Sequence, residues 1–468
     1  DPRALRADAR MPRVLNGTPD QQRVDAMDIA AFLNSGGEQG ELHGTPGVLE
    51  EGAILFNSLG CFTCHRLPGD VLWENDDRLD LKGVGLKWKR NGLIAFLQRP
   101  NQHFRWIRMP DFGLNPNEAA SLVAYVFSRV DEAEVRPGAR AGDPDRGRQL
   151  VESKGCLNCH GLDGAVGRRP APGLSALARS GDASGCLAGD TPGGGVRYDL
   201  DAGQREALAV FLQRDLESLK IGSDTEFVVR QIGNLRCGAC HSLDARADLW
   251  SASLARETGT AAKADAATED DLIDDFGDDT GESGEENAGT ETNIHEVRPP
   301  LTWVGEKLQV DWMDRFIGGR LPYKPRVQLR ARMPAFPAYA SGLARGFALA
   351  HGFSLARAEQ PDVNLERAKI GEELIRVDRL GCASCHAVGD QGALSGAASE
   401  AINFQHTTDR LRRHYFDRFV LNPKRVLPGT MMPQFVDEDG LTPYHEVFEG
   451  NAKRQFDAIW EFMRTLGQ

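Results

Sequence analysis

The chain has 468 residues, too many for a single hydrophobic core, and this length predicts about three to five domains. No apolar run is long enough to span a bilayer, so no transmembrane segment is expected in this chain. The net charge of −13 depends mostly on residues 264–290, which carry 11 acidic and no basic side chains and are predicted to form a disordered insert. The remainder is nearly neutral and has no basic patch, which argues against a nucleic acid partner.

In chain order, one arrangement of elements recurs along the sequence. Four segments carry apolar residues at three- and four-residue steps, which is the spacing of a helix with one buried face. Each of these segments leads directly into a Cys-x-x-Cys-His sequence, and further helical segments follow downstream. The helices expected before the motifs cover residues 47–60, 145–155, 226–236 and 368–381, and those expected after them cover residues 117–127, 341–353 and 453–466.

The four Cys-x-x-Cys-His motifs contain eight of the nine cysteines. Two thiols three residues apart can add to the two vinyl groups of one haem, and the next histidine then lies under the iron. A zinc site built from two Cys-x-x-Cys elements would need no histidine after each pair, and a disulfide framework is typical of shorter chains. We therefore expect four covalently bound haem c groups, attached at Cys61 and Cys64, Cys156 and Cys159, Cys237 and Cys240, and Cys382 and Cys385, with His65, His160, His241 and His386 as proximal ligands.

A Met-Pro-x-Phe sequence follows three of the four motifs. A thioether is a soft, neutral ligand suited to the distal side of a haem iron, and the proline stiffens the segment, or strap, that carries it. Methionine also fills gaps in ordinary cores, but the recurrence favours ligation. Met109, Met333 and Met432 are therefore the expected distal ligands of the first, third and fourth haems.

The order of helix, haem motif, loop, Met-Pro-x-Phe and helix resembles the class I c-type cytochromes, which are small all-helical modules with one haem each. The resemblance implies an all-α fold of tandem cytochrome c domains wrapped around covalently bound haems and joined by long loops. Such haems are attached outside the bacterial cytoplasm, so a periplasmic or extracellular location is expected. The implied modules cover residues 46–135, 143–218, 223–358 with the acidic insert, and 364–468.

The N-terminal residues depart from this pattern because no haem motif precedes them. Arg10-Met11-Pro12 and the helical segment 20–36 have the character of a distal strap and a closing helix. We interpret residues 1–40 as the C-terminal part of a truncated module, with Met11 ligating a haem attached upstream of residue 1. The alternative is a helical arm that packs against the first module, with Met11 in its core.

The second module departs in another way, because residues 145–215 contain no methionine. The cysteine outside the motifs, Cys186, lies in this module and is a candidate thiolate ligand of the second haem. An anionic thiolate would give this haem a lower reduction potential than the His/Met haems. A free thiol, an open or water-bound iron, and a ligand supplied from elsewhere are the alternatives.

These features predict a multihaem c-type cytochrome that passes single electrons along its haems between extracytoplasmic redox partners. It would serve as a subunit of a larger respiratory or photosynthetic complex, or as the cytochrome subunit of a periplasmic dehydrogenase. The alternative is a haem enzyme with thiosulfate dehydrogenase-like or peroxidase-like chemistry at the haem of His160 and Cys186. An electron carrier is favoured over an enzyme, so no catalytic residue is assigned.

Overall fold

The computed structural model describes residues 11–35, 47–130, 142–180, 200–249 and 299–467, apart from short gaps. Two of the sequence-based predictions, the acidic insert at 264–290 and the candidate ligand Cys186, lie outside the described residues. The gaps are at residues 73–77, 103, 163, 166, 168–172, 215, 218–221, 245–247, 328–331, 395–400 and 428–429.

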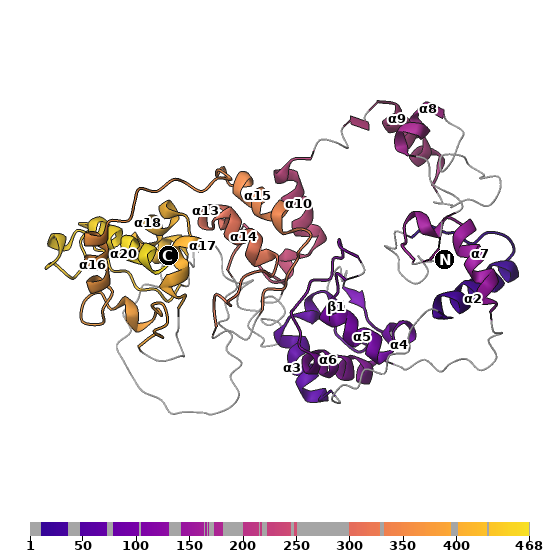
Figure 1. Ribbon diagram of the computed structural model, residues 1–468, viewed down its shortest axis with the longest axis horizontal. Coiled ribbons are helices and arrows are strands. Elements are labelled where there is room, and N and C mark those ends of the chain that lie inside the picture. The colour runs from indigo at the N-terminus through magenta and orange to yellow at the C-terminus, as the bar shows by residue number, and fades with distance from the viewer. Residues whose placement is uncertain are drawn as a thin grey trace. The chain divides into compact units, whose positions relative to one another are not determined.

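Helices predominate in the described part of the chain (Figure 1), in agreement with an all-α fold. The α-helices are α2 (Pro19–Ser35), α3 (Leu49–Ser58), α4 (Val84–Lys87), α5 (Arg90–Gln98), α6 (Pro116–Arg129), α7 (Pro144–Ser153), α8 (Leu174–Ser180), α9 (Ala202–Arg214), α10 (Asp224–Asn234), α13 (Val304–Lys307), α14 (Val310–Ile317), α15 (Ala340–Ala350), α16 (Leu365–Leu374), α17 (Thr407–Arg410), α18 (Arg413–Leu421), α19 (Pro423–Val426) and α20 (Ala452–Leu466). The 3-10 turns are η1 (Cys61–Thr63), η2 (Cys156–Asn158), η5 (Cys237–Ala239), η7 (Cys382–Ser384), η9 (Phe404–His406) and η10 (Phe448–Gly450). The strands β1 (His65–Arg66) and β2 (Leu79–Asp80) form a short parallel pair. Among the described helices, none is both long and apolar enough to cross a membrane.

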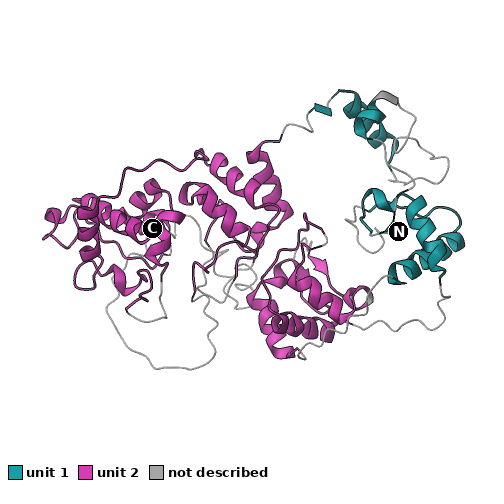
Figure 2. Ribbon diagram, in the orientation of Figure 1, with its two compact units in different colours: residues 1–42, 133–222 teal, residues 43–132, 223–468 magenta. Residues whose placement is uncertain are grey.

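The chain divides into two compact units (Figure 2). Unit 1 combines residues 1–42 with residues 133–222, and unit 2 combines residues 43–132 with residues 223–468. Unit 1 therefore contains the second haem motif together with the N-terminal segment. Unit 2 contains the first, third and fourth motifs.

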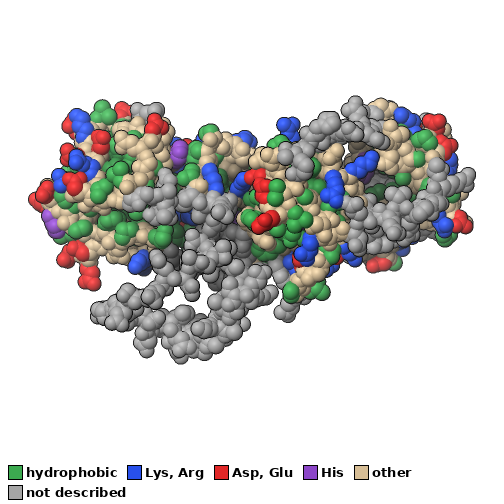
Figure 3. All heavy atoms as spheres, turned by 90° about the horizontal axis from the view of Figure 1, so that it is seen from below, with side chains coloured by type: hydrophobic (Ala, Val, Ile, Leu, Met, Phe, Trp, Pro, Cys, Tyr) green, Lys and Arg blue, Asp and Glu red, His purple; other side chains and the backbone are tan. Residues whose placement is uncertain are grey.

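Unit 2 is built from three copies of one helix pair. In each copy the helix before the motif packs against the helix that closes the module: α3 on α6, α10 on α15, and α16 on α20. Each pair has its own apolar core, formed around Phe56 and Leu122, around Val228 and Leu343, and around Leu374. On the face shown in Figure 3, acidic and basic side chains are interspersed with apolar ones.

A glycine allows the two helices of each pair to approach closely. A Cβ added at Gly52 would overlap with the carbonyl of Ser121 in α6, and one at Gly371 would overlap with the carbonyl of Ala458 in α20. In the third module the glycine lies on the closing helix, where a Cβ at Gly346 would overlap with α10. The backbones therefore touch at the crossing, which larger residues would prevent.

Unit 1 contains a fourth pair of this kind, but its closing helix comes first in the sequence. The N-terminal helix α2 packs against α7, the helix that leads into the second haem motif. Neither expectation for residues 1–40 included this contact between α2 and α7. The helices α8 and α9, which follow the second motif, pack against each other.

Candidate haem sites

The four Cys-x-x-Cys-His motifs share one local conformation. In each, a left-handed residue precedes a 3-10 turn that starts at the first cysteine, and the second cysteine donates its backbone N–H to the first at 3.2 Å. Side chains three residues apart in a 3-10 turn lie on the same side, so both thiols can reach one ligand. The left-handed residues are Gly60 (φ 75°), Gly155 (φ 82°), Arg236 (φ 58°) and Gly381 (φ 72°).

Burial sets the acidity of the first cysteine in three of the motifs. It is the largest cause that raises the pKa of Cys61, Cys237 and Cys382 to about 12 in each case. Burial therefore keeps these thiols protonated, whereas a zinc site would need thiolates. For Cys61 and Cys237 the neighbouring motif also contributes, because Cys240 and Cys64 respectively raise these pKa values further. The first and third motifs are therefore neighbours in unit 2.

The third module brings a predicted proximal ligand and a predicted distal ligand together. His241 Nδ1 lies 2.9 Å from the carbonyl oxygen of Pro299, and only a protonated Nδ1 can donate there. Nε2 is then the unprotonated nitrogen, which is the tautomer that a metal ligand needs. His241 Nε2 faces the Met333 sulfur at 3.5 Å. Metal–nitrogen and metal–sulfur bonds together span about 4 Å, so a small separation of the two side chains would admit an iron.

The fourth module orients its histidine in the same way. His386 Nδ1 lies 2.8 Å from the Ile402 carbonyl oxygen, and the ring stacks on Phe404 with centroids 4.5 Å apart. Burial lowers the pKa of His386, against the smaller effect of the Ile402 contact. Burial therefore favours a neutral imidazole, and the Nδ1 contact with Ile402 leaves Nε2 as the unprotonated nitrogen. The candidate distal ligand, Met432, packs against the apolar core of this module.

The distal straps of the first and third modules pair with each other. Asp111 and Ala335, each two residues after its methionine, form an antiparallel bridge with N–H···O distances of 3.0 and 2.6 Å. Equivalent residues therefore face each other, as in a local two-fold arrangement. The Tyr339 hydroxyl donates to the Trp106 carbonyl at 2.6 Å.

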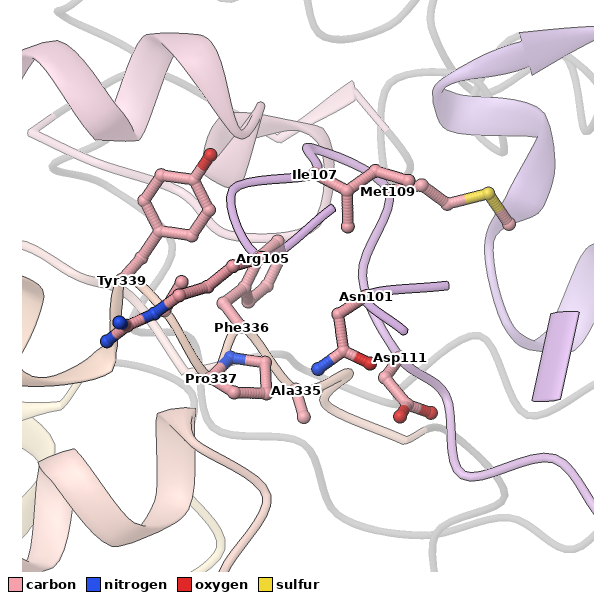
Figure 4. A pocket seen from close by; sticks show the side chains of 10 residues that line it. Asn101, Arg105, Ile107, Met109, Asp111, Ala335, Phe336, Pro337 and Tyr339 are labelled. Atoms are coloured by element: carbon pink, nitrogen blue, oxygen red, sulfur yellow. The ribbon is translucent and has the colours of Figure 1, made fainter. Parts of the chain in front are cut away.

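A small pocket lies where these two straps meet (Figure 4). Met109 and Asp111 line it from the first module, and Phe336 and Tyr339 line it from the third. In the close-up, the thioether of Met109 is directed away from Tyr339 and Phe336. The pocket itself is therefore part of the contact between modules, and the Met109 sulfur points elsewhere.

The third and fourth modules meet at a second pair of equivalent positions. Leu308 and Leu411 form an antiparallel bridge, and the residue directly before each is basic, Lys307 and Arg410. Burial, followed by the charges of Arg410 and Arg326, lowers the pKa of Lys307 to about 7. Burial, followed by Arg326, lowers the pKa of Arg410 to about 10.

Each of these half-buried cations lies over an aromatic ring. The Lys307 ammonium lies 5.3 Å from the ring centroid of Tyr415, and the Arg410 guanidinium lies 5.3 Å from that of Trp312. Among the described residues, no acceptor bonds the buried Nε of Arg410. A haem carries two carboxylate side chains, and such a cluster fits carboxylates well because it would pair both charges and supply the acceptor.

The sequence reasoning assigned no role to this cluster. Its signal was the recurrence of Leu, Val, Gly and Lys in Leu81–Lys87 and Leu301–Lys307. That repeat includes Lys307 but does not show what surrounds it in the fold. Arg410, in a sequence of different composition, shares the position only through the fold.

Comparison with known proteins gives one partial similarity. Over 107 residues the chain is 24% identical to the CcoP subunit of the cbb3-type cytochrome c oxidase from Helicobacter pylori (strain 52), and CcoP from a second strain has the same identity. The matched residues make up 22% of this chain, and the chain spans about a third of the length of these curated relatives, 34% and 35%. No family model and no solved structure matches. The similarity points to the c-type cytochromes.

Proposed function

We propose that this chain is a multihaem c-type cytochrome that carries single electrons between extracytoplasmic redox partners, with one haem c at each of its four motifs. The observation that carries the proposal is the third site. There, an oriented His241 and Met333 face each other beside two cysteines that share a 3-10 turn. A bound haem would supply a one-electron couple at iron, and these residues would fix its position, its axial ligands and its potential.

The contacts between modules support a route for electrons within unit 2. The first and third motifs lie close enough for their thiols to affect one another, and the first and third straps are bridged. The third and fourth modules share the cluster of Lys307, Arg326 and Arg410. The proposed route therefore runs from the first site to the third and then to the fourth, an order that does not follow the sequence.

We also propose that the chain acts as one subunit of a larger electron-transfer complex in the periplasm or outside the cell. This part of the proposal draws on the similarity to CcoP, a subunit of a cytochrome c oxidase. The contacts of the described residues do not favour the enzyme alternative. That alternative depended on Cys186 as an unusual ligand, and Cys186 lies outside the described residues.

Intact-mass spectrometry and a potentiometric titration test the proposal. Each attachment adds two S–H bonds across two vinyl groups without loss of atoms, so the polypeptide mass should increase by four whole haems. Reduction should take up four electrons in one-electron steps. Cys237→Ala with Cys240→Ala should remove one haem and one electron, whereas Ser58→Ala, outside the motifs, should remove neither. A chain without covalent haem, or with haems that do not change oxidation state, would refute the proposed function.

A further inference from the structure

The N-terminal segment and the second haem motif together have the architecture of one complete module. In the first, third and fourth modules, the helix before the motif packs against a closing helix that comes later in the sequence. In unit 1, α7 takes the first role and α2 the second, although α2 precedes α7. The question is whether this pair matches the other three in detail or only in outline.

The crossing of α2 and α7 repeats the crossing of α3 and α6 position by position. Gly52 and Gly147 each lie nine residues before the first cysteine of their motif. A Cβ at Gly52 would overlap with the Ser121 carbonyl and approach the Tyr125 Cβ to 2.7 Å. A Cβ at Gly147 would overlap with the Asp28 carbonyl and approach the Phe32 Cβ to 2.8 Å. In both closing helices the aromatic residue follows the carbonyl by four positions.

The start of the helix before the motif is tied to the closing helix in the same way. Val48, which caps α3, donates its backbone N–H to the Ser121 hydroxyl at 3.1 Å. Asp143, which caps α7, donates its backbone N–H to the Asp28 carboxylate at 2.8 Å. Asp28 in α2 is thus equivalent to Ser121 in α6, because each contacts the crossing glycine and the N-cap residue of its partner helix. A helix that packed on α7 by chance would not reproduce both contacts.

Charged side chains specify this partner. Asp25 and Asp28 of α2 are 3% and 5% exposed. Arg146 of α7 bonds both carboxylates, and the Lys154 ammonium lies 3.1 Å from Asp25. Buried carboxylates need such partners, so α2 would be unstable against an apolar surface such as the cores of unit 2.

The residues after the second motif do not supply a strap of the usual kind. Residues 145–215 contain no methionine, and α9 packs on α8. The N-terminal segment carries a Met-Pro pair, although without the following Phe, and Met11-Pro12 precedes α2 as Met109-Pro110 precedes α6. The first module, residues 43–132, lies in the sequence between the two halves of unit 1.

We propose that residues 11–35 are the distal strap and closing helix of the second module, and that Met11 is the distal ligand of the haem attached at Cys156 and Cys159. The second module is therefore split in the sequence, and the first module is inserted within it. This inference rests on the proposed function, because it needs a haem at the second motif. Met11 takes the place of Cys186 as the sixth ligand of the His160 iron, and the second haem becomes a His/Met relay like the others.

Single substitutions in the full-length holoprotein test the ligand. The readout is the charge-transfer absorption between a thioether sulfur and ferric iron, measured per polypeptide. The wild type should give the signal of four such haems, and Met11→Ala should reduce it to three. Cys186→Ala should leave all four. Met431→Ala is the matched control, since Met431 is 84% exposed and precedes the strap methionine Met432.

A second set of variants assigns the lost signal to the second motif. In a Cys156→Ala and Cys159→Ala background, which lacks that haem, adding Met11→Ala should change nothing further. If Met11→Ala also reduces the signal in this background, Met11 serves another haem and the inference is wrong. It is equally wrong if Met11→Ala leaves the wild-type signal intact while Cys186→Ala changes the spectrum of one haem.

The haem count separates this inference from the proposed function. A chain without covalent haem refutes both the proposed function and the ligand assignment. A chain with four haems whose spectra do not change in Met11→Ala refutes only the ligand assignment. Should Met11→Ala fail to retain the second haem, Met11→His, which offers another strong ligand, should restore four haems with three thioether signals. Failure of Met11→His to restore the fourth haem would count against ligation at this position.

Discussion

At the scale of single residues, Lys307 and Arg410 are the least expected feature of the sites. A buried cation is costly unless it is paired, and the depressed pKa of Lys307, to about 7, reflects that cost. The two residues occupy equivalent positions on either side of the Leu308–Leu411 bridge. We therefore expect them to pair with haem carboxylates and to raise the potentials of the third and fourth haems, because positive charge disfavours ferric iron.

Lys307→Met should lower the potential of at least one of these two haems. At an effective dielectric constant near 20, a unit charge about 10 Å away contributes roughly 1.7 kcal/mol, or about 70 mV, and carboxylate pairing reduces this figure. A potentiometric titration resolved by haem measures the shift. Lys87→Met is the matched control, since Lys87 holds the same position in the first module but is exposed. Equal shifts in the two variants would contradict a special role for Lys307.

At the scale of elements, the junction of α2 and α7 depends on ionised carboxylates. Burial raises the pKa of Asp25, but hydrogen bonds from Gln21, Lys154 and Arg146 outweigh it and lower the pKa below 3.8. A carboxyl whose pKa is lower in the folded state stabilises the fold above its unfolded pKa. That contribution is lost as the pH falls through the folded value.

Acid should therefore loosen α2 from α7 below about pH 4. Hydrogen exchange of residues 19–35 measures the effect. As the pH decreases, amide protection in these residues should fall more steeply than it does in α20. Asp25→Asn should reduce protection at neutral pH and flatten the dependence on pH. Asp20→Asn is the control on the same helix, since the Asp20 side chain is 89% exposed and pairs only at the surface with Arg23. A wild-type profile in Asp25→Asn would show that this carboxyl does not hold the junction.

At the scale of the whole molecule, contacts between modules decide which sites are neighbours within unit 2. The Arg332 guanidinium pairs with Glu118 across the bridged straps, at 3.1 Å for one of its two bonds. The hydrogen bond from Arg332 is the main cause that lowers the pKa of Glu118. Glu118 also completes the cap of α6 with Asn115, so the same carboxylate organises its own module and its neighbour.

Arg332→Ala should loosen the first module from the third by about 1 kcal/mol, the usual value for a well-formed but partly exposed ion pair. The amides of Asp111 and Ala335, which bond across the bridge, should then exchange several times faster. Arg345→Ala removes a comparable pair with Asp224 within the third module and should leave those two amides unchanged. Unaltered exchange in Arg332→Ala would mean that the straps do not depend on this pair.

The sequence by itself determined what is local. Each Cys-x-x-Cys-His motif spans five residues, and its turn is closed by hydrogen bonds within those residues. The helices before the motifs follow from apolar spacing, and the Met-Pro straps from recurrence. None of these features needs a distant partner, so each can be recognised wherever it occurs in the chain.

Only the tertiary structure decided which elements belong together. Arg146 and Asp28 are 118 residues apart in the sequence. Asp111 and Ala335 form a bridge although the second haem motif lies between them in the sequence. The helix pairs share a glycine at the crossing, but in the third module that glycine lies on the closing helix, so the glycines alone do not assign the partners. Sequence order therefore suggested a truncated module at the N-terminus and an unusual second one, whereas packing joins the two, because burial of Asp25 and Asp28 requires the cations of α7.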